Sequence, residues 1–277
     1  MKRKIGIVGL GLIGGSFAKA TTAYTDFEVY GYDIDKRTVQ KAIVENTINL
    51  ELDVSILGEM DLILLAVRPG IAKNFIEENR SIRGVVIDLC GVKRDVSETV
   101  LPIAEKVGFT YIGGHPMAGR EVGGYDNSVK DLYKGASMIL VPHEGEVPEW
   151  IRDYFNKLGF ENIKITTDDE HDRIIAYTSQ LAHVVSNAFV KSKTAVEHFG
   201  YSADSLKDLT RVATLDSEMW SELFFKNSDN LINEIDTLIK ELEKYKNAIE
   251  NHDESMLKFL LDSGVESKKM MYPKEGN

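Results

Sequence analysis

The feature that most constrains the fold is a glycine pattern near the start of the chain. Residues 9–14 read GLGLIG, which matches G-x-G-x-x-G, and they follow the β-type run KIGIVGL at residues 4–10. A helical stretch at residues 14–23 comes directly after the pattern. A strand, a glycine turn and a helix in this order are typical of the loop that holds the pyrophosphate of a dinucleotide. The pattern alone is weak, but its position predicts a dinucleotide cofactor.

Each glycine of the loop has its own physical reason. Gly9 permits the tight turn, Gly11 lets the backbone approach the pyrophosphate, and Gly14 lets the helix pack on its strand. The N-terminus of the helix favours the negative charge of the pyrophosphate. The predicted cofactor-binding residues of the loop are therefore Gly9, Gly11, Leu12, Ile13 and Gly14.

An acidic residue follows the loop at the spacing at which a carboxylate binds the adenosine ribose. Asp33 ends the next β-type run, residues 28–33, and lies 19 residues after Gly14. A carboxylate there would repel the 2′-phosphate of NADP, so NAD is the expected cofactor. Arg37 tempers this preference, because an arginine can bind a 2′-phosphate. FAD or a methyl donor on the same kind of loop is the alternative.

The first part of the chain alternates between short apolar runs and helical stretches. The runs lie at residues 4–10, 28–33, 62–67, 85–89, 110–114, 137–141 and 162–167, and the helical stretches at 14–23, 36–45, 71–79, 95–107 and 148–158. This alternation predicts an α/β fold with a doubly wound parallel sheet. Of 22 glycines, 19 lie in residues 1–166. Residues 149–272 contain no proline, so we expect a domain boundary near residue 166.

The second part, residues 167–277, is predicted to be all-helical. One long helix is expected at residues 169–198, and two amphipathic helices at 228–250 and 253–271. In the first of them the polar side chains Ser179, His183 and Asn187 recur at a spacing of four and share one face. The apolar stripes of these helices suit burial in a dimer as well as in a monomeric core.

Composition and charge exclude several classes of partner. The net charge of −11 provides no basic face for a nucleic acid. No apolar stretch reaches membrane-spanning length, so no membrane is expected as a partner. Cys90 is the one cysteine, so neither a disulfide framework nor a cysteine-based zinc site is expected, and no metal site is predicted. We expect a cytoplasmic protein whose partner is a small anionic substrate.

Further candidates lie where the predicted strands end. In doubly wound sheets, ligands bind beyond the carboxyl ends of the strands. The segments LAVRP (65–69) and DLCGVK (88–93) end two strands there. The residues expected beside the nicotinamide are Val67, Arg68, Asp88 and Gly91.

His115 lies in the segment GGHPMAGRE, residues 113–121, which also follows a strand. The glycines around it let the backbone come close to a ligand. Imidazole titrates near neutral pH, so a histidine at a strand end of a dinucleotide fold is a candidate proton acceptor. A histidine that serves structure alone is the competing interpretation.

Four segments together resemble the prephenate dehydrogenase family, and the resemblance covers nearly the whole chain. They are GLGLIGGS, GGHPMAGRE, TSQLAHVVSNA (178–188) and LTRVATLDSEMW (209–220). The H-P-M-A-G and T-R-V-A…W segments are the specific ones. The resemblance implies a Rossmann-type domain at residues 1–166, then a helical substrate-binding and dimerisation domain at 167–277 that pairs two chains. It also implies transfer of a hydride from prephenate to NAD with loss of carbon dioxide.

The resemblance assigns roles to residues of this chain. His115 matches the family histidine that hydrogen-bonds the substrate's ring hydroxyl, and His183 matches one that lines the substrate pocket. Arg211 matches the arginine that binds a substrate carboxylate. Gly91 departs from the family pattern, because some relatives carry a hydroxyl-binding serine there. Arg120 replaces a threonine of some relatives and is a candidate for binding the pyruvyl carboxylate.

Three other functions stay open at this point. Arogenate dehydrogenase acts on the amino analogue of the same ring. A different hydroxyacid or imine-reducing dehydrogenase would place a lysine on the first long helix, and Lys191 and Lys193 come late for that. A dinucleotide sensor without catalysis would have no need of three substrate-binding residues, His115, His183 and Arg211.

Overall fold

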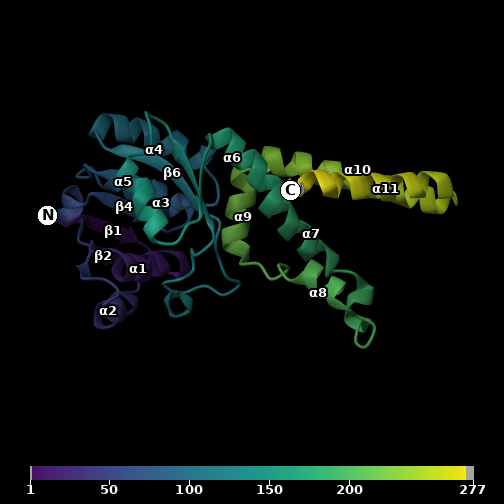
Figure 1. Cartoon of the computed structure of the whole chain (residues 1–277), viewed down its shortest axis with the longest axis horizontal. Helices are drawn as coiled ribbons and strands as arrows, with labels where there is room; N and C mark the ends of the chain where they lie inside the picture. Colours follow the sequence, from purple (N-terminus) through teal and green to yellow (C-terminus); the bar gives the residue numbers. More distant parts are fainter. Residues whose placement is uncertain (1, 273–277) are drawn as a thin grey trace, which may run out of the picture. The chain divides into compact units, whose positions relative to one another are not determined.

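The computed structural model describes residues 2–272, and its centre is an eight-stranded sheet (Figure 1). The strands are β1 (Lys4–Val8), β2 (Glu28–Tyr32), β3 (Leu50–Glu51), β4 (Leu62–Leu65), β5 (Val85–Asp88), β6 (Thr110–Pro116), β7 (Ser137–Pro142) and β8 (Asn162–Ile165). Their order is β3-β2-β1-β4-β5-β6-β7-β8, so the chain winds first to one side of β1 and then to the other. This is the doubly wound order, and the predicted α/β fold class is confirmed. The two-residue strand β3 is too short for the sequence pattern to reveal.

The last two strands differ from the prediction of a parallel sheet. Strands β1 to β6 pair in parallel, but β7 pairs antiparallel with β6, and β8 then pairs parallel with β7. The connection from β6 to β7, residues 117–136, contains the single turn η2 (Tyr125–Asn127) in place of a crossover helix. Without a crossover the chain returns beside β6 in the opposite direction.

Helices cover both faces of the sheet. One face carries α1 (Leu12–Tyr24), α2 (Lys36–Val44) and α5 (Glu149–Lys157), and the other carries α3 (Pro69–Glu78) and α4 (Arg94–Val107). Alternate residues of each strand point into the two cores: Ile5, Ile7 and Leu64 into the first, Val8, Ile63 and Leu65 into the second. The two cores hold the strand ends in fixed positions at one edge. A 3-10 turn, η1 (Val54–Glu59), precedes β4.

The long helix predicted at residues 169–198 is interrupted and ends early. α6 (Asp168–Ile175) continues through the π-helical turn η3 (Ala176–Leu181) into α7 (Ala182–Phe189). After residue 189 the chain forms the 3-10 turn η4 (Lys193–Glu197), because the Ser192 side chain accepts from the Thr194 amide and competes with the helix. The prediction is wrong for residues 190–198. α8 (Asp204–Thr210) and α9 (Ser217–Lys226) follow and were not predicted as helices.

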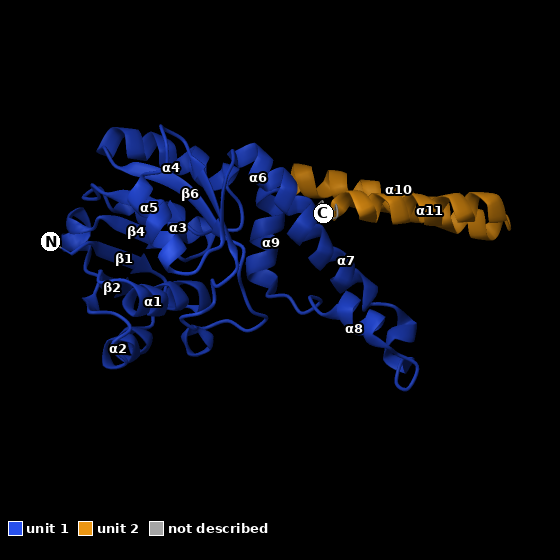
Figure 2. Cartoon of the chain, viewed as in Figure 1, with its two compact units in different colours: residues 1–227 blue, residues 228–277 orange. Residues whose placement is uncertain are grey.

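The chain divides into two compact units, residues 1–227 and 228–277 (Figure 2). The second unit is a hairpin of α10 (Ser228–Glu250) and α11 (Glu254–Met271), which agree with the predicted helices. The boundary predicted near residue 166 falls between β8 and α6, inside the first unit. Within residues 2–272 no helix has the length and apolar character to cross a membrane.

Candidate active site

The glycine loop after β1 has the backbone that the sequence pattern requires. Gly9 has a φ of +88°, and a Cβ there would lie 2.5 Å from the Ala66 carbonyl oxygen. A Cβ on Gly14 would lie 1.8 Å from the Gly9 carbonyl oxygen, so neither position accepts another residue. A Cβ on Gly11 would meet nothing within 4 Å. The open side of the loop therefore lies at Gly11, where a ligand can approach the backbone.

Helix α1 begins beside this open side. Gly11 is its N-cap residue and supplies no side chain that could satisfy the first amides. The N–H groups at the start of a helix have no acceptor inside it, so those of Leu12 and Ile13 are suited to bind an anion. The loop thus fits the pyrophosphate of a dinucleotide.

Asp33 follows β2 at the same edge of the sheet. Its carboxylate accepts hydrogen bonds from the Leu10 amide at 2.7 Å and the Asp35 amide at 2.9 Å. A carboxylate has about four acceptor positions, so two remain for the hydroxyls of a ribose. Arg37 is 94% exposed at its side chain and pairs with Asp35 at 3.1 Å. Arg37 thus has Asp35 as its partner, in an exposed and therefore weak ion pair.

The residues after β4 contact helix α9. Arg68 pairs with Glu218 at 3.2 Å, and the Gly70 amide, in the first turn of α3, donates to Glu222 at 2.8 Å. The Val67 carbonyl accepts from the buried Cys90 thiol at 3.4 Å. α9 therefore lies against the segment that was expected to line the nicotinamide.

Gly91, which follows β5, also faces α9. A Cβ at this position would lie 3.3 Å from a methyl group of Leu223. The place where some relatives are expected to carry a serine is therefore next to an apolar side chain. A hydroxyl there would need Leu223 to move, so the glycine and the leucine fit as a pair.

Asp88 ends β5, and its carboxylate points into the protein. The side chains of Asp88 and Lys93 are both 0% exposed and form an ion pair. Asp88 also accepts from the Tyr111 hydroxyl at 2.8 Å, and Lys93 donates to the Gly114 carbonyl at 2.6 Å. The predicted contact of Asp88 with the cofactor cannot use this carboxylate. Its role in the structure is to tie β5 to β6 immediately before His115.

His115 lies at the carboxyl end of β6 and contacts a second histidine. Its Nδ1 is 2.9 Å from Nε2 of His171, and Nδ1 of His171 is 2.8 Å from the carboxylate of Asp172. Burial, followed by the charge that His171 carries when it is protonated and by the charge of Lys93, lowers the pKa of His115 well below its ordinary value of 6.5. His115 is thus a neutral base at neutral pH.

His171 and Asp172 are buried at the start of α6. Burial lowers the pKa of His171, the hydrogen bond to Asp172 only partly opposes this, and the charge of Lys93 adds to the lowering. Burial alone would raise the pKa of Asp172, but its bond to His171 and the amides of Lys93 and Arg94 hold the pKa below the usual value. At neutral pH Asp172 is therefore a carboxylate beside a neutral His171.

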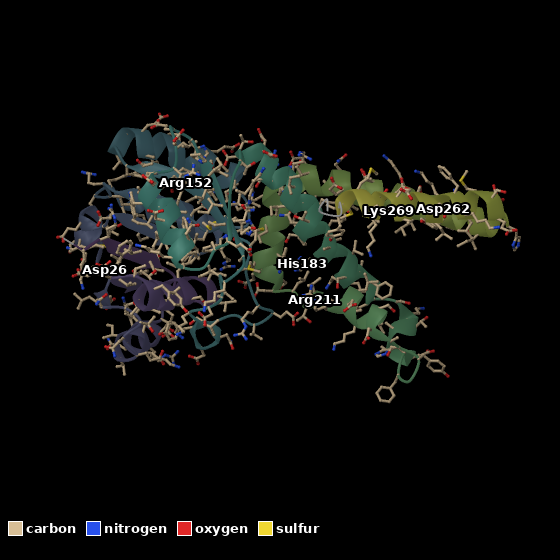
Figure 3. The ribbon with its side chains drawn as sticks, in the orientation of Figure 1. Asp26, Arg152, His183, Arg211, Asp262 and Lys269 are labelled. Atoms are coloured by element: carbon tan, nitrogen blue, oxygen red, sulfur yellow. The ribbon has the colours of Figure 1, made fainter. Side chains whose placement is uncertain are left out.

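The two helical candidates, His183 and Arg211, are labelled in Figure 3. His183 lies on α7, where its Nδ1 is 2.8 Å from the Ser179 carbonyl and its ring centroid is 4.0 Å from that of Trp220. Arg211 follows α8 and pairs with Glu121 at 3.4 Å, and both side chains are about two-thirds exposed, at 65% and 64%. Arg120 is exposed and donates to the Asn127 carbonyl of its own loop at 3.1 Å.

The structure connects Arg211 to the segment after His115 through Glu121, which was not a predicted site residue. Glu121 follows His115 by six residues and contacts Arg211, which joins the loop after β6 to the end of α8. The glycine loop, Gly91 and His115 follow β1, β5 and β6 at one edge of the sheet. Neighbouring strands lie about 4.8 Å apart, so β1 and β6 are separated by roughly 14 Å. An extended dinucleotide spans that distance.

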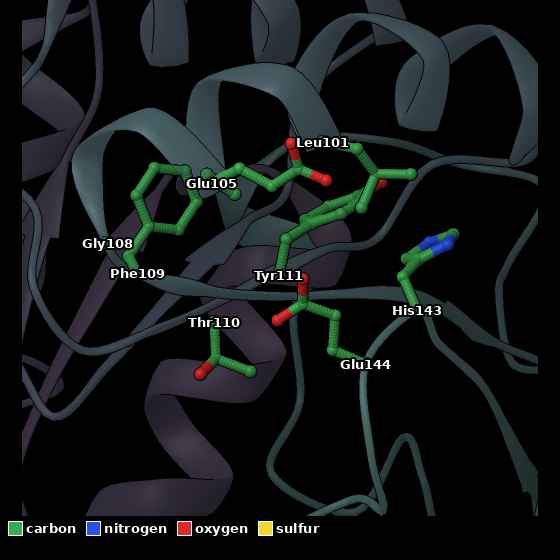
Figure 4. Close-up of a pocket in the computed structure, with 9 residues that line it drawn as sticks. Leu101, Glu105, Gly108, Phe109, Thr110, Tyr111, His143 and Glu144 are labelled. Atoms are coloured by element: carbon green, nitrogen blue, oxygen red, sulfur yellow. The ribbon is translucent and has the colours of Figure 1, made fainter.

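A separate cavity of about 390 Å³ lies away from these residues (Figure 4). It is lined by the second half of α4, the start of β6 and the residues after β7: Leu101, Ala104, Glu105, Gly108, Phe109, Thr110, Tyr111, His143 and Glu144. None of them is a predicted site residue. The cavity is therefore not the candidate active site.

Sequence reasoning missed His171, Asp172 and the buried partner Lys93. The segment DDEHDRII looks like the charged first turn of a helix, and nothing in it points to a residue 56 positions earlier. The available signal was weak: a His-Asp pair directly after the last predicted strand. Lys93 ends the segment DLCGVK, and nothing in that segment indicates that its side chain is buried beside Asp88.

A doubly wound sheet with this glycine loop, and a neutral histidine at the same edge, defines a dinucleotide-dependent dehydrogenase. Two family models match consecutive parts of the chain. The nucleotide-binding domain of prephenate dehydrogenase matches residues 17–166, and its dimerization domain matches residues 167–263. The chain therefore belongs to the prephenate dehydrogenase family, and the predicted resemblance is confirmed.

Individual relatives agree with this assignment over almost their full length. Cyclohexadienyl dehydrogenase of Zymomonas mobilis is 31% identical, over 96% of this chain and 94% of its own. The crystal structure of prephenate dehydrogenase from A. aeolicus with hydroxyphenyl propionate and NAD+ has a TM-score of 0.82 at 25% identity, covering 98% of this chain and 99% of that one. Arogenate dehydrogenase of Synechocystis has a TM-score of 0.78 at 25% identity, with 97% and 99% covered.

Proposed function

We propose that the protein catalyses the NAD-dependent oxidative decarboxylation of prephenate to 4-hydroxyphenylpyruvate, a step of tyrosine biosynthesis. The observation that carries the proposal is His115. His115 is partly buried, has a lowered pKa and contacts the buried His171. It lies at the same end of the strands as the glycine loop. A neutral imidazole there is suited to accept the proton of the substrate's ring hydroxyl.

The reaction removes a hydride, a proton and a carboxylate from one ring. When bound, NAD supplies the acceptor for the hydride on ring carbon C4. His115 takes the proton of the C4 hydroxyl as the carbon–oxygen double bond forms. The carboxylate on C1 leaves as carbon dioxide, its bonding electron pair makes the ring aromatic, and His115 returns the proton to the phenolate oxygen. The products are 4-hydroxyphenylpyruvate, carbon dioxide and NADH, and no net proton is released.

Residues from the helices and from the loop after β6 are proposed to bind the substrate's charges. Arg211 offers a planar guanidinium for a carboxylate, and its exposed pairing with Glu121 is weak enough for a substrate to replace it. The second residue is His183. Nδ1 of His183 donates to the Ser179 carbonyl, so His183 presents Nε2 as an acceptor beside Trp220. Arg120 is proposed to add positive charge for the pyruvyl carboxylate.

Arogenate is the second candidate substrate, and one observation favours it. Arogenate carries an ammonium group where prephenate carries a keto group, and the Glu121 carboxylate beside Arg211 is suited to such a cation. The name of the Synechocystis relative, arogenate dehydrogenase, points the same way. Arg120, the neighbour of Glu121, favours the keto acid because it would repel an ammonium group.

The assembly is also a proposal. We propose a cytoplasmic homodimer without nucleic-acid or membrane partners, since the family model for residues 167–263 is described as a dimerization domain. The hairpin of α10 and α11 exposes large apolar side chains that a partner chain would cover, among them Ile239, Leu242 and Phe259. Cys90 is a free buried thiol, which suits a reducing compartment.

The test of the function is NADH appearance by absorbance, with purified protein and NAD, on prephenate and arogenate in parallel. We expect turnover on prephenate at a higher kcat/KM than on arogenate. A reversed ratio would make the protein an arogenate dehydrogenase with the same chemistry. Bound NAD without turnover on either ring would contradict the proposed enzyme and favour a dinucleotide sensor.

Replacement of Asp33 by asparagine is expected to reduce the preference for NAD. The variant keeps the shape but loses the charge that holds the ribose hydroxyls and repels a 2′-phosphate, and hydrogen bonds to charged groups contribute about 1.5–3 kcal/mol. The ratio of kcat/KM for NAD to that for NADP should therefore fall by about 10- to 100-fold.

The matched control for Asp33→Asn is Arg37→Ala. Arg37 pairs with Asp35 and is almost fully exposed, so its removal should leave KM for NAD unchanged. An unaltered NAD-to-NADP ratio in Asp33→Asn would show that this carboxylate does not bind the ribose.

A further inference from the structure

Three side chains form a continuous hydrogen-bonded row that begins with the candidate base, His115. His115 on β6 contacts His171 on α6 through Nδ1 and Nε2 at 2.9 Å, and His171 contacts Asp172 through Nδ1 and Oδ1 at 2.8 Å. His171 is 2% exposed and Asp172 is 0% exposed. The row therefore runs from the site edge into the interior, and water does not compete for its inner bonds.

The inner end of the row is fixed by the backbone at the start of α4. The Asp172 carboxylate accepts from the Lys93 amide at 2.8 Å and from the Arg94 amide at 3.0 Å. Arg94 Nε adds a contact to the same carboxylate at 3.4 Å. All these partners are donors, so the carboxylate is held ionised and can only accept from His171.

The direction of each hydrogen bond follows from this fixed end. Because Asp172 only accepts, Nδ1 of His171 must carry the proton and donate it. A neutral histidine has one donor and one acceptor nitrogen, so Nε2 of His171 accepts. The proton between the two rings then belongs to Nδ1 of His115. Nε2 of His115 is left with the lone pair that a proton acceptor needs.

We propose that His171 and Asp172 are positioning residues that hold His115 in the Nδ1–H tautomer, so that Nε2 meets the substrate as a proton acceptor. That the accepted proton comes from the substrate's ring hydroxyl rests on the proposed function. The tautomer of His115 is a property of the protein alone and can be measured without a ligand. A histidine in the opposite tautomer would present an N–H to the substrate hydroxyl. It would then have to lose a proton before it could take one.

Burial and the charge of Lys93 favour the neutral form of both rings, whereas Asp172 and Asp88 favour the charged form of His171 without overcoming its burial. His115 faces Lys93 and His171, and His171 faces Lys93, Asp172 and Asp88. Lys93 is paired with Asp88, and Arg94 with Asp172, so the row adds one positive charge when His115 takes the substrate proton. That charge lies next to His171, whose bond to the Asp172 carboxylate can stabilise it through the intervening ring.

The test compares two substitutions at His171 by 15N NMR of the ligand-free protein. In the wild type we expect His115 to show a protonated Nδ1 and an unprotonated Nε2. His171→Gln keeps an acceptor oxygen for His115 and an N–H₂ for Asp172, so the tautomer should be retained. His171→Leu removes the acceptor, and the His115 proton should move to Nε2. Asp172 is left unchanged in both, because it also holds the start of α4.

Kinetics provides the second measurement. His171→Leu should lower kcat about 10²-fold with KM for both substrates unchanged, a smaller loss than the ~10⁴-fold for the wrong tautomer in a Ser-His-Asp triad. His171→Gln should recover most of kcat. His143→Leu is the matched control, because His143 also pairs with an aspartate, Asp168 at 3.5 Å, but away from His115. It should leave the His115 spectrum unaltered.

Two results would overturn the proposal. One is an Nε2–H tautomer of His115 in the wild type, and the other is an equal loss of kcat in both His171 variants with equally lowered unfolding midpoints. The second result would mean that His171 serves stability alone. Absence of turnover in the wild type would count against the proposed function, and the NMR comparison would still decide the tautomer.

Discussion

The variant His115→Asn is expected to lower kcat on prephenate by about 10²- to 10⁴-fold, the usual contribution of a general base. Asparagine keeps a polar side chain of similar size but accepts no proton near neutral pH. NADH binding should be unchanged, because the glycine loop and Asp33 belong to other strands. Steady-state kinetics together with NADH fluorescence titration separates the two effects.

The pH profile gives a second check on His115. The lowered pKa means that the base stays neutral down to acidic pH, so wild-type kcat/KM should be flat through neutrality and fall only below the usual histidine pKa of 6.5. This acidic limb should be lost in His115→Asn. His198→Asn is the matched control, since His198 is exposed and bonds to Ser202. An unchanged kcat in His115→Asn would remove the base from the mechanism.

The variant Lys93→Met is expected to destabilise the protein by about 3–5 kcal/mol, the typical cost of leaving one buried charge unpaired. Methionine fills much of the volume of the lysine but leaves the Asp88 carboxylate without its cation and the Gly114 carbonyl without its donor. Urea unfolding followed by circular dichroism measures the loss. Lys157→Met, an exposed lysine on α5, should be nearly neutral.

A second substitution tests the reason for that loss. Asp88→Asn in the Lys93→Met background removes the unpaired charge and should restore part of the stability, whereas Asp88→Asn alone should destabilise. If the double variant were as unstable as the sum of the two single ones, the ion pair would not be the cause. The acidic limb of kcat/KM should also move to higher pH in Lys93→Met, because the charge of Lys93 helps to lower the pKa of His115.

The sheet and its cofactor loop were predictable because their signals are local. The run KIGIVGL, which leads into GLGLIG, predicts a strand, a turn and a helix within a few residues, and each of the seven predicted runs overlaps a strand. The direction of β7 was not predictable, because it depends on the connection and not on the strand's own residues. Residues 190–198 were wrongly predicted because helical spacing continues there while Ser192 ends the helix.

The candidate site was predictable only in part for a similar reason. His115 stood out because glycines surround it, and His183 and Arg211 because a family motif contains them. The bond between His115 and His171 joins a strand to a helix 56 residues later, and no local pattern encodes such a contact. The same holds for Gly91. The reason for a glycine at this position, the close approach of Leu223, is visible only in the structure.

The reversal of strand direction after β6 affects how this enzyme can diverge. The connection to β7 leaves and re-enters the sheet at one edge, and its second half is anchored by Tyr125, which bonds to Thr47, and by the Val129 amide, which bonds to Ser16. The first half, with Arg120 and Glu121, is exposed and is flanked by glycines on both sides. Changes of length or charge there cost little stability. Lineages can therefore change the length and charge of this segment while His115, the candidate base that precedes it, is inherited unchanged.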